Sequence, residues 1–334
     1  MPELRIDPLS GARVIVAGER SERPGAFLAV EPRPPIDPQD DPFLAGHEDQ
    51  TPPELHALRP DGAAEHEWRV RVVPNLYPAL TAAEGPDAPD PLAEGRGDPD
   101  LFAVRPAAGA HEVIVNAPDP VSSLLELDTS QVEAAMSVWR ERMRFHGEAG
   151  AAYVHLIVNE GREAGASLPH THAQLYALPF VPAAVARERE RFTAYSDRTN
   201  GRNLMEDLLQ EEVRRRERVV AVDSEAVVLC PFAARTPFHL QVVPRRPAAR
   251  FEDEGPLGAA ALLGALARLA SVLGGLPPLN MWVRTAPRDA ERFCWRIEVQ
   301  PRLAQLAGLE MGTGVHLNVL APERAAEQLR AVDV

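Results

Sequence analysis

The sequence contains no lysine. All 35 of its basic residues are arginine, and 49 acidic residues outnumber them, so the formal net charge is −14. A surface that binds nucleic acid needs clustered positive charge, and this balance argues against nucleic acid as a partner. An all-arginine basic set in a chain with 33 prolines and abundant alanine is typical of a GC-rich coding sequence. We therefore attach no function to the missing lysine itself.

Cysteine is scarce as well, with only Cys230 and Cys294. Two cysteines are too few for a disulfide framework or a cysteine-based metal site. The chain has no apolar run of 18 residues, which a membrane-spanning helix requires, and no apolar N-terminal segment typical of a secretory signal. We expect a cytoplasmic protein without a membrane partner.

The order of hydrophobic patterns predicts a mixed α and β chain. At 334 residues it can bury a large core, as one domain or as two halves. The patterns predict strands at 13–17, 68–73, 111–116, 152–158, 170–178, 219–230, 237–243, 278–284 and 293–300. They predict helices at 129–147 and 257–273, a polar helical region at 183–217, and surface loops at 31–62 and 84–110. Asp128 and Gln131 resemble a capping box at the start of the first helix.

A strand pair, a helix and a second strand pair occur in each part of the chain, which suggests two structurally related halves. Hairpins and long connections favour a largely antiparallel α+β architecture. We predict an N-terminal half at residues 1–180 and a C-terminal half at residues 181–334.

The most informative segment, residues 167–174, reads Ser-Leu-Pro-His-Thr-His-Ala-Gln. If it is a strand, His170, His172 and Gln174 lie on one face. The small, glycine-containing run at 159–167 would let backbone N–H groups approach an anion. A neutral imidazole can attack phosphorus and leave again, so the segment is typical of a covalent phosphoryl or nucleotidyl carrier. A structural histidine pair or two metal ligands fit the spacing as well.

Other motifs follow in one order and together resemble the galactose-1-phosphate uridylyltransferases, a branch of the histidine triad superfamily close to the ADP-glucose phosphorylases. They are Arg20 and Arg23 in Gly-Glu-Arg-Ser-Glu-Arg-Pro, Asn75 in Val-Pro-Asn-Leu-Tyr-Pro, His111-Glu-Val-Ile-Val, Cys230-Pro-Phe, Val243-Pro-Arg-Arg and Trp295-Arg-Ile-Glu-Val-Gln-Pro. The resemblance covers nearly the whole chain. It implies a histidine-triad-like fold, in which two related halves form one mostly antiparallel sheet flanked by helices.

The resemblance implies a role for each residue of the site. His172 would be the nucleophile that becomes nucleotidylated, and Gln174 would donate its amide N–H to a phosphate oxygen. Glutamine cannot protonate a leaving group, which favours transfer over hydrolysis. Ser167 and Gly165 would bind phosphates, although a serine can also cap its own loop. The implied substrate-binding residues are Asn75 and Asn159 near the nucleotide, Arg20 and Arg23 at the sugar phosphate or the partner subunit's site, and Glu310 at the hexose.

The metal positions of the family do not match this chain. The Cys-x-x-Cys half-site is replaced by Asp41-Pro-Phe-Leu44 and a third ligand by Pro120, which leaves only His170. At the second site the replacements are Arg246-Pro247 and Cys294-Trp295-Arg296, which leave only Glu188. Because a zinc site usually takes four ligands, we predict that the protein holds no metal and no other cofactor.

The resulting hypothesis is a nucleotidyltransferase of nucleotide-sugar and galactose metabolism. It would exchange a nucleoside monophosphate between a nucleoside-diphosphate sugar and a sugar 1-phosphate by ping-pong chemistry. One alternative is a phosphorylase that uses inorganic phosphate on ADP-glucose or a dinucleoside polyphosphate, and another is a non-catalytic nucleotide-binding protein. Retention of His172, Gln174 and Ser167 argues against the last. By analogy with the family we expect a homodimer.

Overall fold

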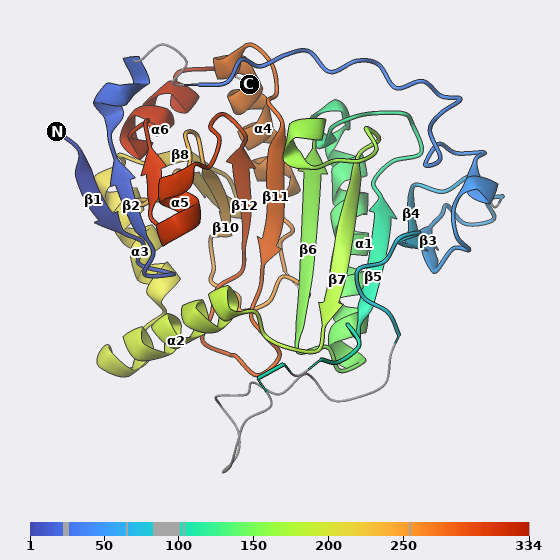
Figure 1. Ribbon diagram of the computed structural model, residues 1–334, viewed down its shortest axis with the longest axis horizontal. Helices are drawn as coiled ribbons and strands as arrows, with labels where there is room; N and C mark the ends of the chain where they lie inside the picture. The colour runs from blue at the N-terminus through green and yellow to red at the C-terminus, as the bar shows by residue number, and fades with distance from the viewer. Residues whose placement is uncertain (23–26, 65, 83–100, 103, 254, 334) are drawn as a thin grey trace.

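The protein is built around a ten-stranded sheet, as a computed structural model shows (Figure 1). The structure describes residues 1–22, 27–64, 66–82, 101–102, 104–253 and 255–333. Every strand pair in this sheet is antiparallel. In spatial order the strands are β3 (His56–Leu58), β4 (Val70–Pro74), β5 (Ala110–Val115), β7 (His172–Leu178), β6 (Tyr153–Glu160), β11 (Leu279–Arg284), β12 (Arg296–Pro301), β10 (Leu240–Pro244), β9 (Ala226–Leu229) and β8 (Val219–Val222).

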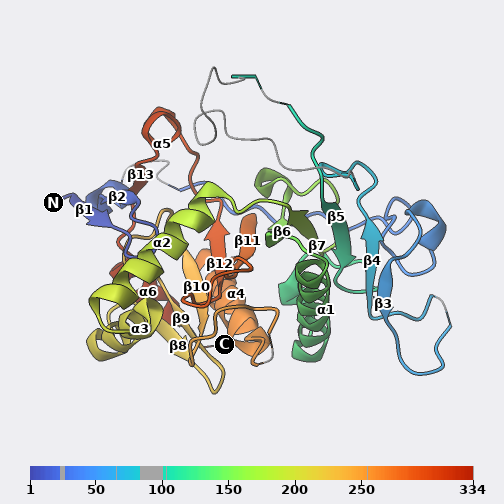
Figure 2. The same ribbon diagram turned by 90° about the horizontal axis from the view of Figure 1, so that it is seen from below.

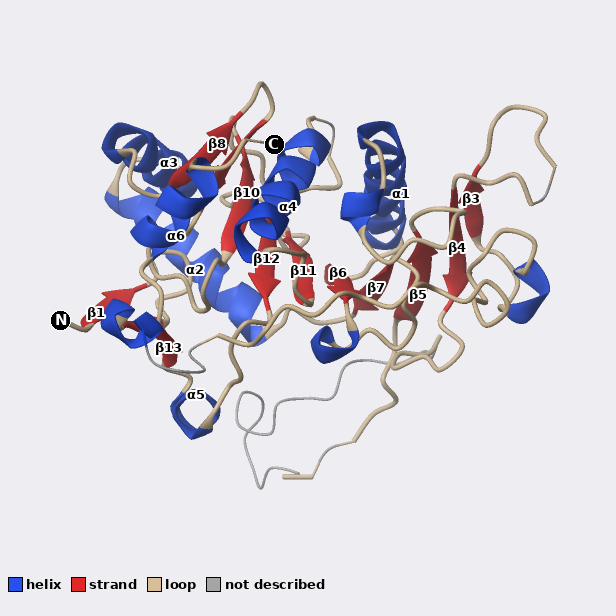
Figure 3. Ribbon diagram, turned by 90° about the horizontal axis from the view of Figure 1, so that it is seen from above, coloured by secondary structure: helices blue, strands red, loops and turns tan. Residues whose placement is uncertain are grey.

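The strand order repeats across the join between β6 and β11. On one side it runs β4, β5, β7, β6, and on the other β9, β10, β12, β11. Helix α1 (Thr129–Glu148) follows the second strand of the first set, and α4 (Ala259–Leu273) follows the second strand of the other. Both helices lie on the same face of the sheet (Figure 3). The predicted antiparallel α+β fold is therefore confirmed, while the boundary at residue 180 stays a prediction.

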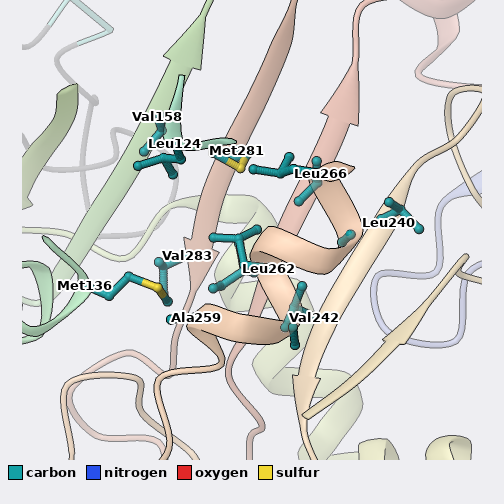
Figure 4. Packing of buried hydrophobic residues seen from close by; sticks show 14 of the residues in the cluster. Leu124, Met136, Val158, Leu240, Val242, Ala259, Leu262, Leu266, Met281 and Val283 are labelled. Carbon is teal, nitrogen blue, oxygen red and sulfur yellow. The ribbon is translucent and has the colours of Figure 1, made fainter. Parts of the chain in front are cut away.

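A single hydrophobic core lies between the sheet and these two helices. Figure 4 shows Leu262 and Leu266 of α4 beside Met281 and Val283 of β11, with Met136 of α1 close by, so side chains of both strand sets meet in one cluster. Complete burial of a side chain of this size contributes roughly 1.5–3 kcal/mol. The two strand sets are therefore joined by this shared core as well as by the backbone hydrogen bonds between β6 and β11.

Helix α1 begins where the sequence predicts, but its first turn is held differently. The Asp128 side chain accepts a hydrogen bond from the Gln131 N–H at 2.8 Å, as in a capping box. The Gln131 side chain does not return the bond, because its Oε1 accepts from Arg69 Nε at 3.2 Å while its Nε2 donates to the carbonyls of Arg69 at 2.8 Å and Asn116 at 2.7 Å. Tertiary contact with the sheet therefore replaces the second half of the predicted box.

The remaining helices and a small sheet surround the second strand set. They are α2 (Ala183–Arg198), α3 (Leu204–Arg215), α5 (Gly308–Thr313) and α6 (Pro322–Arg330), with β1 (Glu3–Ile6), β2 (Arg13–Val16) and β13 (His316–Asn318) in a three-stranded sheet. Figure 2 places this sheet and α5 at the end of the molecule away from β3. Among the described residues no helix is long and apolar enough to span a bilayer.

Candidate active site

The first residue of β7, His172, opens onto a cavity of about 390 Å³. Ala173, Leu175 and Ala177 belong to the core beneath α1, and alternation along the strand sends His172, Gln174 and Tyr176 to the opposite face. The cavity is lined by Pro42, Phe43, Gln50, Thr51, Pro52, Val73, Pro74, Asn75, Leu76, Tyr77, Val113, Ser167, Leu168, His172 and Gln174. It therefore brings together four of the predicted site residues, Asn75 from one segment of the chain and Ser167, His172 and Gln174 from another.

Two larger hollows of about 710 and 770 Å³ are open and are lined mainly by charged or exposed polar side chains. Neither contains a predicted site residue. The smaller cavity is more enclosed, has an apolar wall and contains a buried imidazole, which is the usual composition of a ligand site.

The hydrogen bond of His172 determines its tautomer. Its Nδ1 lies 2.7 Å from the backbone carbonyl oxygen of His170, and a carbonyl can only accept, so Nδ1 carries the proton. In the neutral ring the lone pair is then on Nε2. Burial lowers the pKa of His172, and the bond to the carbonyl offsets part of that shift. A neutral imidazole with a free Nε2 is a nucleophile at neutral pH.

His170 lies before the first residue of β7 and does not line the cavity that His172 faces. Its Nδ1 lies 2.7 Å from Asp41 Oδ2, and its Nε2 lies 2.9 Å from the carbonyl oxygen of Ala117. The cavity therefore receives His172 and Gln174 of the predicted set but not His170. The His170 ring anchors the loop around Asp41 to the start of β7.

The loop before β7 has the shape that an anion site requires. Gly161 has φ +87°, and a Cβ at this position would lie 2.9 Å from Pro278 Cβ, so only glycine fits. Gly165 has φ +90°, and its N–H bonds within the turn to the Arg162 carbonyl. Among the described residues, no protein acceptor is found for the backbone N–H groups of Ser167 and Leu168. Ser167 itself is exposed on the cavity wall, and these two amides are free for a phosphate.

Asn159 lies behind this loop and is held from the second strand set. The Asn280 side chain of β11 donates to Asn159 Oδ1 at 2.8 Å and to the Ala164 carbonyl at 2.7 Å. Asn159 does not line the cavity that His172 faces. Its position supports the loop, and the structure adds Asn280 as a residue that sequence reasoning missed.

Arg20 and Glu310 do not join His172 within one chain. Arg20 is exposed in the short 3₁₀ helix η1 (Gly18–Glu22) after β2, and Glu310 lies in α5, at the three-stranded end of the molecule (Figures 1 and 2). Glu310 accepts from the Ala307 N–H at 3.0 Å and the Leu317 N–H at 3.3 Å. Arg23 lies outside the described residues.

The residues left at the family's metal positions do not fit a metal ion. Both ring nitrogens of His170 already lie within hydrogen-bond distance of protein oxygens, so both are occupied by protein contacts. Glu188 accepts a hydrogen bond from the Arg296 guanidinium at 2.9 Å, and Arg284 Nε lies 3.5 Å from its other oxygen. Arginine side chains therefore already pair with the carboxylate that would bind a metal ion. Across the described part of the chain, no group of three or more His, Cys, Asp or Glu side chains is arranged to hold a metal.

Comparisons with known proteins agree with this geometry. The family model for the N-terminal domain of galactose-1-phosphate uridyl transferase matches residues 1–182, and a domain of unknown function, DUF4921, matches residues 121–332. An ADP-glucose phosphorylase of Arabidopsis thaliana is 29% identical, covering 100% of this chain and 93% of the relative. A galactose-1-phosphate uridylyltransferase of Thermotoga maritima is 27% identical, covering 100% of this chain and 99% of the relative.

Solved structures give the same result. The crystal structure of an ADP-glucose phosphorylase from Arabidopsis thaliana with bound ADP-glucose has a TM-score of 0.81 at 26% identity, covering 100% of both chains. The resemblance drawn from the dispersed motifs is thereby confirmed, including its link to the phosphorylase branch. Since the first family model spans more than half of the sequence, the chain belongs to the galactose-1-phosphate uridyl transferase family.

Proposed function

We propose that this protein transfers a nucleoside monophosphate from a nucleoside-diphosphate sugar to a sugar 1-phosphate through a covalent intermediate on His172. One observation carries the proposal: a buried imidazole has its Nδ1 proton bonded to a carbonyl, and it shares a cavity with an amide donor and a loop with free N–H groups. The relatives named above are nucleotidyl-transferring enzymes, which agrees with an enzyme of this kind.

In the first step the Nε2 lone pair of His172 attacks the α-phosphorus. The P–O bond to the β-phosphate breaks, and hexose 1-phosphate leaves with that electron pair. The ring becomes cationic, and the Nδ1–H bond to the His170 carbonyl stabilises it. In the second step a phosphate oxygen of the acceptor attacks the same phosphorus, the P–N bond breaks, and His172 regains its lone pair.

Charge stabilisation in both steps is assigned to Gln174 and to the backbone N–H groups of Ser167 and Leu168. These donors are fixed by a strand and by a turn before any substrate arrives, so little reorganisation accompanies the reaction. The apolar side of the cavity, formed by Phe43, Pro52 and Val73 with neighbouring residues, suits the face of a nucleobase.

A second candidate function is phosphorolysis, with inorganic phosphate as the acceptor. It is favoured by the Arabidopsis relative named as an ADP-glucose phosphorylase and by the superposition on its structure with bound ADP-glucose. Both reactions share the first step and differ only in the acceptor that discharges the intermediate.

We further propose that the protein acts as a homodimer without bound metal. Arg20 and Glu310 lie away from the cavity of their own chain, and Met311 and Leu309 beside Glu310 are exposed, as are Leu76 and Tyr77 at the cavity. A second copy would unite these surfaces and add the sugar-side residues. Two buried, unpaired cysteines are consistent with a reducing cytoplasm.

Intact-protein mass spectrometry tests the covalent step. The protein is incubated separately with UDP-glucose, ADP-glucose, GDP-sugar and dTDP-sugar and quenched at mildly alkaline pH, since a P–N bond is labile in acid. We expect a mass gain of one nucleoside monophosphate, which identifies the base. The gain should be absent in His172→Ala and retained in His66→Ala, a matched control because His66 is exposed and lies outside the cavity.

Addition of an acceptor to the labelled protein then separates the two functions. Loss of the label with a sugar 1-phosphate alone supports the transferase, and loss with inorganic phosphate alone supports the phosphorylase. A label that persists in His172→Ala would contradict the nucleophile assignment. Nucleotide binding without a label from any donor would identify a non-catalytic nucleotide-binding protein.

A further inference from the structure

The carboxamide of Gln174 is held by two neighbours at its oxygen. Gln174 Oε1 accepts from the Tyr176 hydroxyl at 3.0 Å and lies 3.1 Å from His111 Nε2. Within the part of the chain that the structure describes, Gln174 Nε2 has no protein acceptor, and Gln174 lines the cavity. The orientation of this amide therefore depends on which neighbour supplies a proton to Oε1.

The His111 ring is restricted to one tautomer by the backbone. The Ala79 N–H donates to His111 Nδ1 at 3.1 Å, so Nδ1 must carry the lone pair. In the neutral ring the proton is then on Nε2, where it can be donated to Gln174 Oε1. Burial lowers the pKa of His111, and the bond to Gln174 offsets part of that shift, so the ring stays neutral at physiological pH.

The same tautomer affects Asn75. The Tyr77 N–H donates to Asn75 Oδ1 at 2.8 Å, which fixes the oxygen and leaves Asn75 Nδ2 3.1 Å from His111 Nε2. Two N–H donors cannot bond to one another, so Asn75 Nδ2 keeps its hydrogens for another acceptor. Asn75 and Gln174 both line the cavity, where the Tyr77 N–H holds the carboxamide of Asn75 and His111 holds that of Gln174.

We propose that His111 is a positioning residue for phosphate stabilisation: with Tyr176 it holds Gln174 Oε1, so that the Gln174 amide faces the reacting phosphoryl group. This proposal rests on the proposed function for its catalytic consequence. Without the two donors the carboxamide could rotate and present its oxygen to the phosphate, where it would repel the developing charge. His111 thus acts through Gln174 and does not touch the phosphorus itself.

A purely structural role makes a different prediction. His111 stacks on Tyr176 with ring centroids 4.1 Å apart at 23°, and only 8% of His111 is exposed, so it also fills space. If packing alone mattered, the position of the nitrogen atoms in the replacement would be unimportant. If the Nε2 proton matters, a side chain that places an N–H near that atom should restore activity.

The experiment measures the first-order rate of nucleotidyl transfer to His172 in the whole protein. We expect His111→Leu to lower this rate by roughly 10- to 100-fold, as is typical when a residue that orients a catalytic ligand is lost. Tyr176→Phe, which keeps the ring and removes one hydrogen bond, should cost roughly 3- to 10-fold. KM for the donor should change less than the rate, because the bond strengthens in the transition state.

His111→Gln should recover most of the rate, because its amide nitrogen reaches the position of Nε2, whereas His111→Asn should not. The matched control is His155→Gln on β6, whose backbone pairs with Tyr176 and whose side chain makes no bond to Gln174. In a Gln174→Ala background, His111→Leu should cost little more. Equal losses in His111→Gln and His111→Leu, or a further tenfold loss without Gln174, would overturn the proposal.

A second readout separates this proposal from the proposed function. Nitrogen-15 NMR of histidine-labelled protein reports the tautomer directly, and the His111 signals are assigned by their loss in His111→Gln. We expect a protonated Nε2 and an unprotonated Nδ1. A protonated Nδ1 would overturn the proposal whether or not any nucleotide sugar labels the wild type, while absence of label alone counts against the proposed function.

Discussion

At the scale of single residues, the reactivity of His172 depends on which of its two ring nitrogens carries a proton. Burial removes water from the ring, which disfavours the cation, while the His170 carbonyl fixes the remaining proton on Nδ1. The resting ring is thereby a neutral imidazole, and in the proposed mechanism only the nucleotidylated ring carries a charge. This arrangement keeps the resting enzyme reactive and makes the imidazole a good leaving group.

A pH dependence follows from the lowered pKa of His172. The nucleophile must be unprotonated, so kcat/KM should stay level as the pH falls through 6.5, the ordinary value for histidine, and decline only below it. The decline should follow one proton, since Nε2 is the atom that titrates. The initial rate of label formation measured between pH 4.5 and 8.5 tests this, and an acid limb centred at or above pH 6.5 would contradict it.

Residue-scale prediction succeeded where neighbours are close in sequence. The two-residue period of a strand places His172 and Gln174 on one face, and the glycine run before them indicates a turn. The hydrogen-bond partners of His170 and Gln174 could not be predicted from local patterns. Asp41 lies 129 positions from His170 in the sequence, and His111 lies 63 positions from Gln174. Nothing local to His111 indicates that its ring will meet the catalytic strand, although its motif was recognised.

At the scale of elements, strongly periodic segments were predicted well and short ones were not. The segment 219–230, predicted as one strand, is a hairpin of β8 and β9. Asp223 Oδ1 accepts from the N–H groups of Glu225 and Ala226, both at 2.7 Å, and this side-chain turn reverses the chain. β3, within the predicted loop 31–62, and β13 have three residues each and are defined by their partner strands, not by their own pattern.

Two buried polar contacts connect elements at the positions where the resemblance to the family implies metal ligands. The Asp41–His170 pair ties the loop before η2 (Glu48–Gln50) to the start of β7, and the Arg296–Glu188 pair ties β12 to α2. Each pair joins groups that are almost fully buried, so it stays in place without help from solvent ions. In the metal-free protein that we propose, these contacts connect the same elements that a metal would connect.

Metal removal should therefore have no effect. We expect dialysis against EDTA to leave the melting temperature and the labelling rate unchanged, and metal analysis to find much less than one zinc per chain. A structural zinc contributes on the order of 10 kcal/mol, so its loss would be plain in a melting curve. About one tightly held zinc per chain, with a fall in melting temperature on chelation, would contradict the prediction.

At the scale of the whole molecule, the proposed dimer predicts complementation. His172→Ala lacks the nucleophile, and Glu310→Ala lacks a residue that we assign to the partner's site. If the two variants form mixed dimers, one of the two sites in each mixed dimer contains both wild-type residues. Random mixing of equal amounts should then restore about a quarter of wild-type activity in a symmetric dimer.

The complementation is measured after the variants are mixed under conditions that allow subunit exchange, with sedimentation to give the assembly mass. His172→Ala mixed with His172→Ala serves as the matched control and should stay inactive. A monomer by sedimentation, or a mixture as inactive as either variant alone, would contradict the shared site.

The pairing of β6 with β11 also determines whether the chain can be cut into two separate fragments. β6 is bonded to β7 on one side and to β11 on the other, and Asn280 of β11 holds the loop before the catalytic strand. A fragment that ended near residue 180 would keep β6 as a bare eight-residue edge. Unpaired edges of this kind recruit other strands and aggregate. The part of the chain that carries the nucleophile therefore depends on the other part for its solubility as much as for its geometry.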